Sequence, residues 1–238
     1  MVSPDPTTLL AFGAHPDDIE FGAGGIIARE TAAGRPVHFV VCSKGESGTN
    51  GTPAQRVAEA EKAAAILGAT LEFADLGGDA HFVPSLPNAL KLAAIIRRIR
   101  PALVLAPTLI ENQHPDHSTL GKLVRNAARL ARYGGVKELI DTPAHAISAL
   151  FFYAITPEAE PRNHATLFVN VSDCVPTWSA AMQAHASQAA TRDYVELQLT
   201  RAHLHGLSAG VAHAIPLWPA DPLVVDSLAP MVRTARRF

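Results

Sequence analysis

The stretch LLAFGAHPDD, residues 9–18, decides the fold and marks where its chemistry lies. Its first five residues form an apolar run that is typical of a buried strand. Residues 19–33 have the apolar spacing of a helix, and Gly34 follows as a stop signal. The histidine and the two carboxylates of the stretch therefore stand at the exit of a strand. Open α/β sheets bind their ligands at that end of their strands.

A second polar cluster follows another apolar run farther along the chain. Residues 103–106 are apolar, and NQHPDH at positions 112–117 comes shortly after them in a polar loop. Either cluster alone is best explained as a helix cap with an acidic first turn, or as a surface loop. If both strands are central in one parallel sheet, the two clusters face each other across one crevice, and the pair indicates a site.

Strands and helices alternate along most of the chain. Strands are expected at 8–14, 37–42, 70–75, 102–106, 150–155 and 166–171. Helices are expected at 19–33, 53–67, 87–100, 118–132 (with Ser118 as its cap) and 175–190. This order predicts an α/β fold, a Rossmann-like three-layer α/β/α arrangement with a mostly parallel sheet and extra strands and a helix in the C-terminal part. We expect one domain over 1–238, with 1–135 as the core and 136–238 as its extension.

Composition excludes several classes of protein. The 238 residues are 48% hydrophobic, and the 20 Lys and Arg against 22 Asp and Glu give a formal net charge of −2, so no nucleic-acid partner is expected. No apolar run approaches the ~20 residues of a membrane helix. With 2 cysteines and no leader-like segment, we expect a cytoplasmic protein. The apolar, proline-rich residues 215–219 are expected to pack at a subunit interface or to cover the site.

The clustered side chains favour a metal-dependent enzyme. Imidazole and carboxylate are usual ligands of first-row metals, and three protein ligands with one open position define a catalytic site. Adjacent acids at a strand end can point in opposite directions, so one acid can bind the metal while the other accepts a proton from water. In the same way, one histidine of the second cluster can bind while the other donates. The residues of this set are His15, Asp17, Asp18, His114, Asp116 and His117.

Dinucleotide binding is the rival interpretation of the first cluster, because Gly22, Gly24 and Gly25 follow it. The dinucleotide fingerprint needs its glycines at the turn between strand and helix, where backbone N–H groups meet the phosphates. Here the turn carries two carboxylates, which would repel a phosphate. The glycines fall inside the expected helix, where close packing explains them.

The motifs resemble those of a known family. AHPDD with Glu20 and GxGG at 22–25, followed by HPDH at 114–117, is similar to the LmbE/PIG-L family of zinc-dependent N-deacetylases, including those of the bacterial mycothiol and bacillithiol pathways. The resemblance continues through GExGT at 45–49, RxxE at 56–59 and SQ at 187–188. Departures at 76–79 and at 145–146 lie where a substrate would be recognised, so the resemblance leaves the particular substrate open.

The resemblance implies a role for each residue of the motifs. One zinc ion per subunit would be bound, although ferrous iron accepts the same ligands. Asp17 would be the general base, and His114 would stabilise the oxyanion and help to protonate the leaving amine, with Asp116 orienting it. The expected metal ligands are His15, Asp18 and His117. Arg56 and Glu46 are expected to contact the substrate.

The function that the resemblance implies is hydrolysis of a linear amide bond. A small N-acetylglucosamine-type conjugate would lose its acetyl group, releasing acetate and a free amine. The family also implies a homo-oligomer. Two alternatives remain: a deacylase or amide hydrolase acting on a non-sugar conjugate, and a non-catalytic protein that binds sugar.

Overall fold

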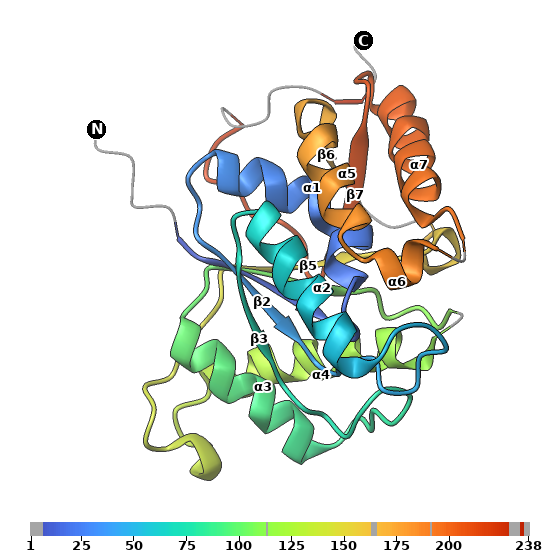
Figure 1. Cartoon of the computed structure of the whole chain (residues 1–238). Coiled ribbons are helices and arrows are strands. Elements are labelled where there is room, and N and C mark those ends of the chain that lie inside the picture. Colours follow the sequence, from blue (N-terminus) through green and yellow to red (C-terminus); the bar gives the residue numbers. More distant parts are fainter. Residues whose placement is uncertain (1–6, 113, 163–165, 191, 229–233, 236–238) are drawn as a thin grey trace.

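The computed structural model describes residues 7–112, 114–162, 166–190, 192–228 and 234–235 (Figure 1). Within them, one seven-stranded sheet has the order β3-β2-β1-β4-β5-β7-β6. Neighbouring strands from β3 to β5 are parallel, whereas β7 is antiparallel to both β5 and β6. The strands are β1 Leu9–Gly13, β2 Val37–Val41, β3 Thr70–Phe73, β4 Leu103–Pro107, β5 Ala149–Tyr153, β6 Leu167–Asn170 and β7 Ala214–Pro219. The predicted α/β fold with a mostly parallel sheet is confirmed.

Helices cover both faces of this sheet. They are α1 Asp18–Ala32, α2 Pro53–Ile66, α3 Leu86–Ile99, α4 Pro115–Arg132, α5 Val175–Gln183, α6 Ala186–Ala189 and α7 Tyr194–Ala209. Short 3-10 helices occur at Lys137–Leu139, Pro157–Ala159 and Ser172–Cys174. In the part of the chain that the structure describes, no helix combines the length and the apolar character required to cross a bilayer.

The two faces of β1 join two separate cores. Leu9 and Ala11 pack with residues of α1, α2, α5 and α7, whereas Leu10 and Phe12 pack with residues of α3 and α4. A parallel strand covered on both faces is expected to be an unbroken apolar run, as β1 is. Leu217 of β7 belongs to the first core and Trp218 to the second. Both cores therefore include residues from the two ends of the chain.

Two helix boundaries differ from the sequence-based expectation. Helix α4 begins at Pro115, so its N-cap is His114 and not Ser118. Proline suits the first helical position because the N–H it lacks would have no partner there. The expected helix over 175–190 is two helices, because the chain leaves helical geometry at His185, whose ring is buried against Glu20.

The expectation that the proline-rich residues 215–219 pack at a subunit interface or cover the site is wrong. They belong to β7, which lies between β5 and β6, and they are buried or nearly so within the sheet. Prolines are generally excluded from the interior of a sheet because they cannot donate a hydrogen bond to the neighbouring strand. Their presence is the reason that no strand was predicted over these residues. The segment neither covers the site nor forms a free apolar surface.

The glycines of α1 serve close packing, as expected. A Cβ atom on Gly22 would lie 2.4 Å from the ring of Tyr153 in β5, and one on Gly24 would lie 2.6 Å from the ring of Trp178 in α5. Bare backbone at these positions lets α1 approach its neighbours closely and fixes the helix that follows the first polar cluster.

Gly121 provides a test of the packing of α4 against β4. A Cβ atom there would lie 2.3 Å from the carbonyl oxygen of Pro107, which is backbone and cannot move aside alone. We predict that Gly121→Ala lowers the free energy of unfolding by about 1–3 kcal/mol in urea denaturation. Gly134→Ala, with open space around it, is the control and should change it by less than about 0.5 kcal/mol. Equal stability of the two variants would contradict the packing.

Candidate active site

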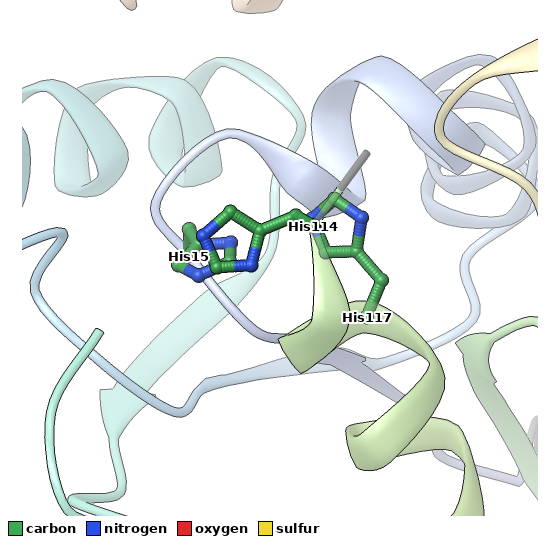
Figure 2. Close-up of side chains that lie close together, drawn as sticks. All are labelled: His15, His114 and His117. Carbon is green, nitrogen blue, oxygen red and sulfur yellow. The ribbon is translucent and has the colours of Figure 1, made fainter. Parts of the chain in front are cut away.

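The two polar clusters meet at one edge of the sheet. Their strands, β1 and β4, are parallel neighbours with Leu9 opposite Leu103, so the segments that follow them leave the sheet side by side. The ring centroid of His15 lies 4.2 Å from that of His114 and 5.3 Å from that of His117 (Figure 2). Residues about a hundred positions apart thus form one group.

The turn after β1 gives its two aspartates different surroundings. Oδ2 of Asp18 accepts the backbone N–H groups of Ala14 at 2.8 Å and His15 at 2.9 Å, which closes the turn around that carboxylate. Asp17 has a φ of 112°, a left-handed conformation that is uncommon outside glycine and that aspartate tolerates better than most residues. Such strain costs of order 1–3 kcal/mol and clusters at functional sites.

The carboxylate of Asp18 contacts both of the histidines that are predicted to bind metal with it. Oδ1 of Asp18 lies 3.1 Å from Nε2 of His117, and Oδ2 lies 3.4 Å from Nδ1 of His15. Nδ1 of His117 contacts Oδ1 of Asn112 at 3.1 Å, and this amide oxygen also accepts the N–H of His114. Because an amide oxygen only accepts, His117 carries its proton on Nδ1 and directs the lone pair of Nε2 toward Asp18. Buried imidazole and carboxylate donors arranged in this way fit a divalent first-row metal.

A carboxylate that the sequence analysis missed stands behind His15. Nε2 of His15 lies 3.1 Å from Oδ1 of Asp79 and 3.5 Å from Oδ2 of Asp116. Asp79 belongs to the loop after β3. The available signal was topological: β3 is a further parallel strand of the same sheet, so the loop at its exit reaches the same edge. Carboxylates commonly orient a metal-binding imidazole through its other nitrogen.

His114 occupies the N-cap of α4, and its ring is held from both sides. Its Nδ1 accepts the backbone N–H of Asp116 at 3.3 Å, and its Nε2 lies 3.3 Å from Oδ1 of Asp79. The carboxylate of Asp116 accepts the N–H groups of Ala80 at 2.8 Å and Phe82 at 3.4 Å. Asp116 therefore contacts the ring of His114 through its backbone, and its carboxylate holds the loop after β3.

The two adjacent aspartates have pKa values displaced in opposite directions. Burial, with the charge of Asp18, raises the pKa of Asp17 to about 6, although Arg56 opposes the shift. Burial would also raise the pKa of Asp18, but His117 and His15 hold it well below its usual range. Neighbouring carboxyls with separated pKa values are typical of sites in which one acts as a base and the other stays ionised.

The two predicted substrate contacts lie in different places. Arg56 is buried on α2, donates from Nη2 to the carbonyl oxygen of Pro16 at 2.9 Å, and lies 3.6 Å from Oδ2 of Asp17. It also lines the cavity of the site. Glu46 is exposed and accepts the N–H groups of Lys44 and Asp79, each at 3.1 Å. Among the described residues that line the cavity, Glu46 does not appear. Substrate contact by either residue stays a prediction.

The cavity beside this group has a volume of about 560 Å³. That size is within the range of small-molecule sites. The apolar side chains that line it include Phe21, Ile155, Tyr194 and Leu197, and the polar ones include Thr49 and Gln188. The segment after β5 and helix α7 thus complete the site. Sequence reasoning did not identify them, because no motif marks either segment.

Comparison with known proteins identifies the family. The family model described as PIG-L, GlcNAc-PI de-N-acetylase, matches residues 10–128, which is half of the chain and includes both His/Asp clusters. The chain belongs to this family. The predicted resemblance is therefore confirmed, and the family is one of de-N-acetylases.

Similar proteins with known structures or curated names include both deacetylases and hydratases. Conserved protein TT1542 from Thermus thermophilus is 31% identical with a TM-score of 0.82, over 96% of this chain and 100% of that one. Diacetylchitobiose deacetylase from Thermococcus kodakarensis is 28% identical over 77% of this chain and 71% of its own length. GalB, the 4-carboxy-2-hydroxymuconate hydratase from Pseudomonas putida, is 26% identical with a TM-score of 0.81, over 94% of this chain and 100% of that one.

Removal of one donor tests the metal site. We predict that His117→Ala retains less than about a tenth of the zinc bound by the wild-type protein after dialysis against a weak chelator. Loss of a residue that only hydrogen-bonds to a ligand typically lowers metal affinity about 10–100-fold, and loss of a ligand itself should lower it further. His203→Ala, which removes an exposed histidine of α7, is the control and should retain it all. Metal analysis measures both. Full zinc content in His117→Ala would exclude this donor set.

Proposed function

We propose that the protein is a metal-dependent hydrolase that removes the acetyl group from an N-acetylated amino-sugar conjugate, releasing acetate and a free amine. The main support for the proposal is that possible metal ligands from the ends of two strands lie together at one cavity. Asp17 and the Nε2 of His114 lie beside them. Membership of a de-N-acetylase family and similarity to a diacetylchitobiose deacetylase support it.

His15 through Nδ1, Asp18 and His117 through Nε2 would hold the metal. A divalent ion bound there polarises an amide carbonyl and makes water more acidic. We assign zinc, one ion per subunit, and the same ligands accept ferrous iron.

The remaining residues move protons and stabilise charge. Asp17 takes a proton from the attacking water, and Arg56 keeps that carboxylate in place from 3.6 Å. His114 donates its Nε2–H to the carbonyl oxygen as that oxygen gains charge; a donor of this kind is worth about 3 kcal/mol of barrier. The leaving nitrogen then receives a proton from Asp17 or His114, and the amine and acetate separate.

The substrate is proposed to be a small conjugate that fills the cavity. The apolar side chains that line the cavity suit the face of a sugar ring, and the polar ones suit hydroxyl groups, with Arg56 as a direct contact. Glu46 would act on the substrate only through the loop that it braces. We retain the expectations of a single-domain, cytoplasmic homo-oligomer with no nucleic-acid partner.

Hydration of an activated double bond is the second candidate function. A 4-oxalmesaconate hydratase from Pseudomonas putida is 34% identical over 54% of this chain and 54% of its own length, and GalB matches nearly the whole chain. A base that activates water can serve an addition as well as a hydrolysis. Arg56 and Arg192, which both line the cavity, would suit the carboxylates of an unsaturated acid.

A substrate panel separates these functions. The zinc-loaded protein is offered N-acetylglucosaminides with varied aglycones, simple acyl amides and conjugated unsaturated dicarboxylates. We expect acetate and free amine in equal amounts from the glucosaminides. Loss of the ultraviolet absorbance of an unsaturated acid without amine release would favour the hydratase, amine from acyl amides alone would favour the non-sugar deacylase, and sugar binding without turnover would favour a binding protein.

Asp17→Asn tests the general base. Asparagine also tolerates the left-handed conformation at this position, so the turn should form. We predict unchanged zinc content with kcat lowered about 10²–10⁴-fold, the usual contribution of a general base. Asp173→Asn, at a site where the side chain is 91% exposed, is the matched control. Wild-type turnover by Asp17→Asn would remove Asp17 from the mechanism.

A further inference from the structure

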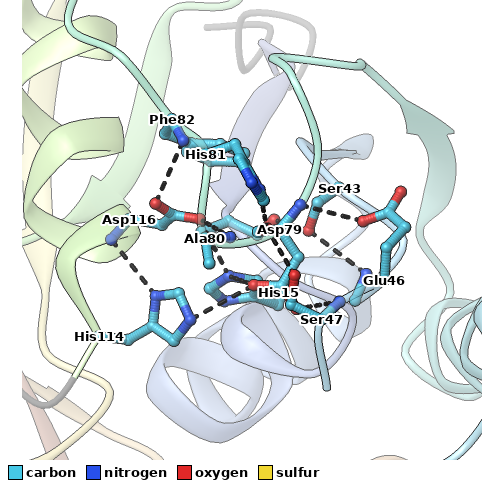
Figure 3. A network of polar contacts seen from close by, with 12 residues as sticks. His15, Ser43, Glu46, Ser47, Asp79, Ala80, His81, Phe82, His114 and Asp116 are labelled. Atoms are coloured by element: carbon cyan, nitrogen blue, oxygen red, sulfur yellow. Dashed lines mark hydrogen bonds and ion pairs between the residues drawn. The ribbon is translucent and has the colours of Figure 1, made fainter.

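Asp79 contacts both the proposed metal ligand His15 and the proposed donor His114 (Figure 3). We propose that Asp79 is a positioning residue that fixes the ring orientation and the tautomer of both histidines and ties them to the loop that lines the cavity. This inference deepens the proposed function, on which it rests for the role of His114.

A single buried oxygen serves both rings. Oδ1 of Asp79 lies 3.1 Å from Nε2 of His15 and 3.3 Å from Nε2 of His114, and the residue is 4% exposed. Both separations are within the range of a hydrogen bond, yet Oδ1 of Asp79 is not aligned with either N–H, so each contact is a close charge–dipole contact. An anionic oxygen isolated from water in this way interacts strongly with any N–H group turned toward it.

The opposite nitrogen of each ring settles which nitrogen carries the proton. Nδ1 of His114 accepts the backbone N–H of Asp116, so a neutral His114 is protonated at Nε2. With the proposed metal on Nδ1 of His15, which faces Asp18, the Nε2 of that ring would also keep its proton. Both N–H groups therefore lie close to Oδ1 of Asp79 without being aligned with it, so that of His114 stays available to a substrate, and the charge of Asp79 favours these two tautomers over the alternatives.

Three hydrogen bonds, to Ser47 and Glu46, hold Asp79 itself. Its Oδ2 accepts the N–H of Ser47 at 3.2 Å, its carbonyl oxygen accepts the hydroxyl of Ser47 at 2.8 Å, and its N–H donates to Glu46 at 3.1 Å (Figure 3). The next residue, Ala80, donates its N–H to Asp116 of α4. Since Ser47 also lines the cavity, Asp79 connects the loop after β2 with both histidines. A carboxylate fixed in this way can set ring positions in turn.

A cation bound at Asp79 is the rival explanation. Donor atoms of His15, Asp79, His114 and Asp116 all lie within 4.8 Å of one another. Binding there would require Nε2 of both histidines to lose its proton, and His114 would then give up the hydrogen bond from Asp116. The tautomer that the structure supports at His114 thus favours positioning over a second metal.

Asp79→Asn tests the proposal, with Asp75→Asn as the matched control in the same loop. Asp75 is exposed and accepts the N–H of Gly77, which asparagine can also do. We expect Asp79→Asn to bind zinc about 10–100-fold more weakly in competition with a chelator, because it removes an outer partner of a ligand. With zinc saturating, kcat should still fall while KM changes little, because the orientation of His114 is lost. Long-range ¹H–¹⁵N spectra should show Nε2-protonated His114 in wild type and control, and a tautomer mixture in Asp79→Asn.

The outcomes are distinct. The measurements of zinc affinity and of the imidazole spectra need no substrate. They therefore test the positioning role of Asp79 even if the substrate class given under the proposed function is wrong. Wild-type zinc affinity and an unchanged tautomer in a folded Asp79→Asn would overturn it. Two zinc ions per wild-type chain and one in the variant would also overturn it, in favour of a metal at Asp79. Equal losses of zinc affinity and kcat in Asp79→Asn and Asp75→Asn would show that the effect comes from a less stable loop, which would contradict a specific role of Asp79.

Discussion

The site depends on one electrostatic constraint: several carboxylates are collected at the edge of the sheet, where imidazole rings and Arg56 are the partners of their charge. Asp18, Asp79 and Asp116 are buried, and Arg56 is the nearest guanidinium, 3.6 Å from Asp17. Buried charge is costly unless it is paired or coordinates a metal. Backbone N–H groups offset part of the cost at Asp18 and Asp116. Imidazole and carboxylate groups as close together as those of His15, Asp18 and His117 are a donor set that a bound divalent cation would satisfy.

The parallel sheet is what gathers these groups. Strands β3, β2, β1 and β4 are consecutive neighbours, and the segment that follows each of them contributes to the site. Each contribution is local in sequence: a closed turn after β1, a glycine-containing loop after β2, Asp79 after β3 and the first turn of α4 after β4. Their hydrogen bonds to one another then join the segments into a single rigid edge (Figure 3). Proton transfer and metal binding both require such fixed positions.

Much of the fold and of the site could be predicted from the sequence. Strand β1 was evident because buried parallel strands are unbroken apolar runs, and the site was evident because two His/Asp clusters at the ends of two such strands are expected to meet. Asp79 was missed because its meaning depends on which strand neighbours which, and a lone aspartate after two glycines resembles any turn. The start of α4 was misjudged because HPDH looks like a loop, whereas His114 caps the helix. Strand β7 was missed because its prolines argue against a sheet and only tertiary pairing overrides them.

X-ray diffraction from crystals of the zinc-loaded protein, recorded on both sides of the zinc absorption edge, tests the central claim most directly. The account predicts one anomalous peak per chain, about 2.0–2.2 Å from Nδ1 of His15, a carboxylate oxygen of Asp18 and Nε2 of His117. A peak on the other side of His15, among Asp79, His114 and Asp116, would contradict it, as would a crystal that binds zinc only at surface histidines.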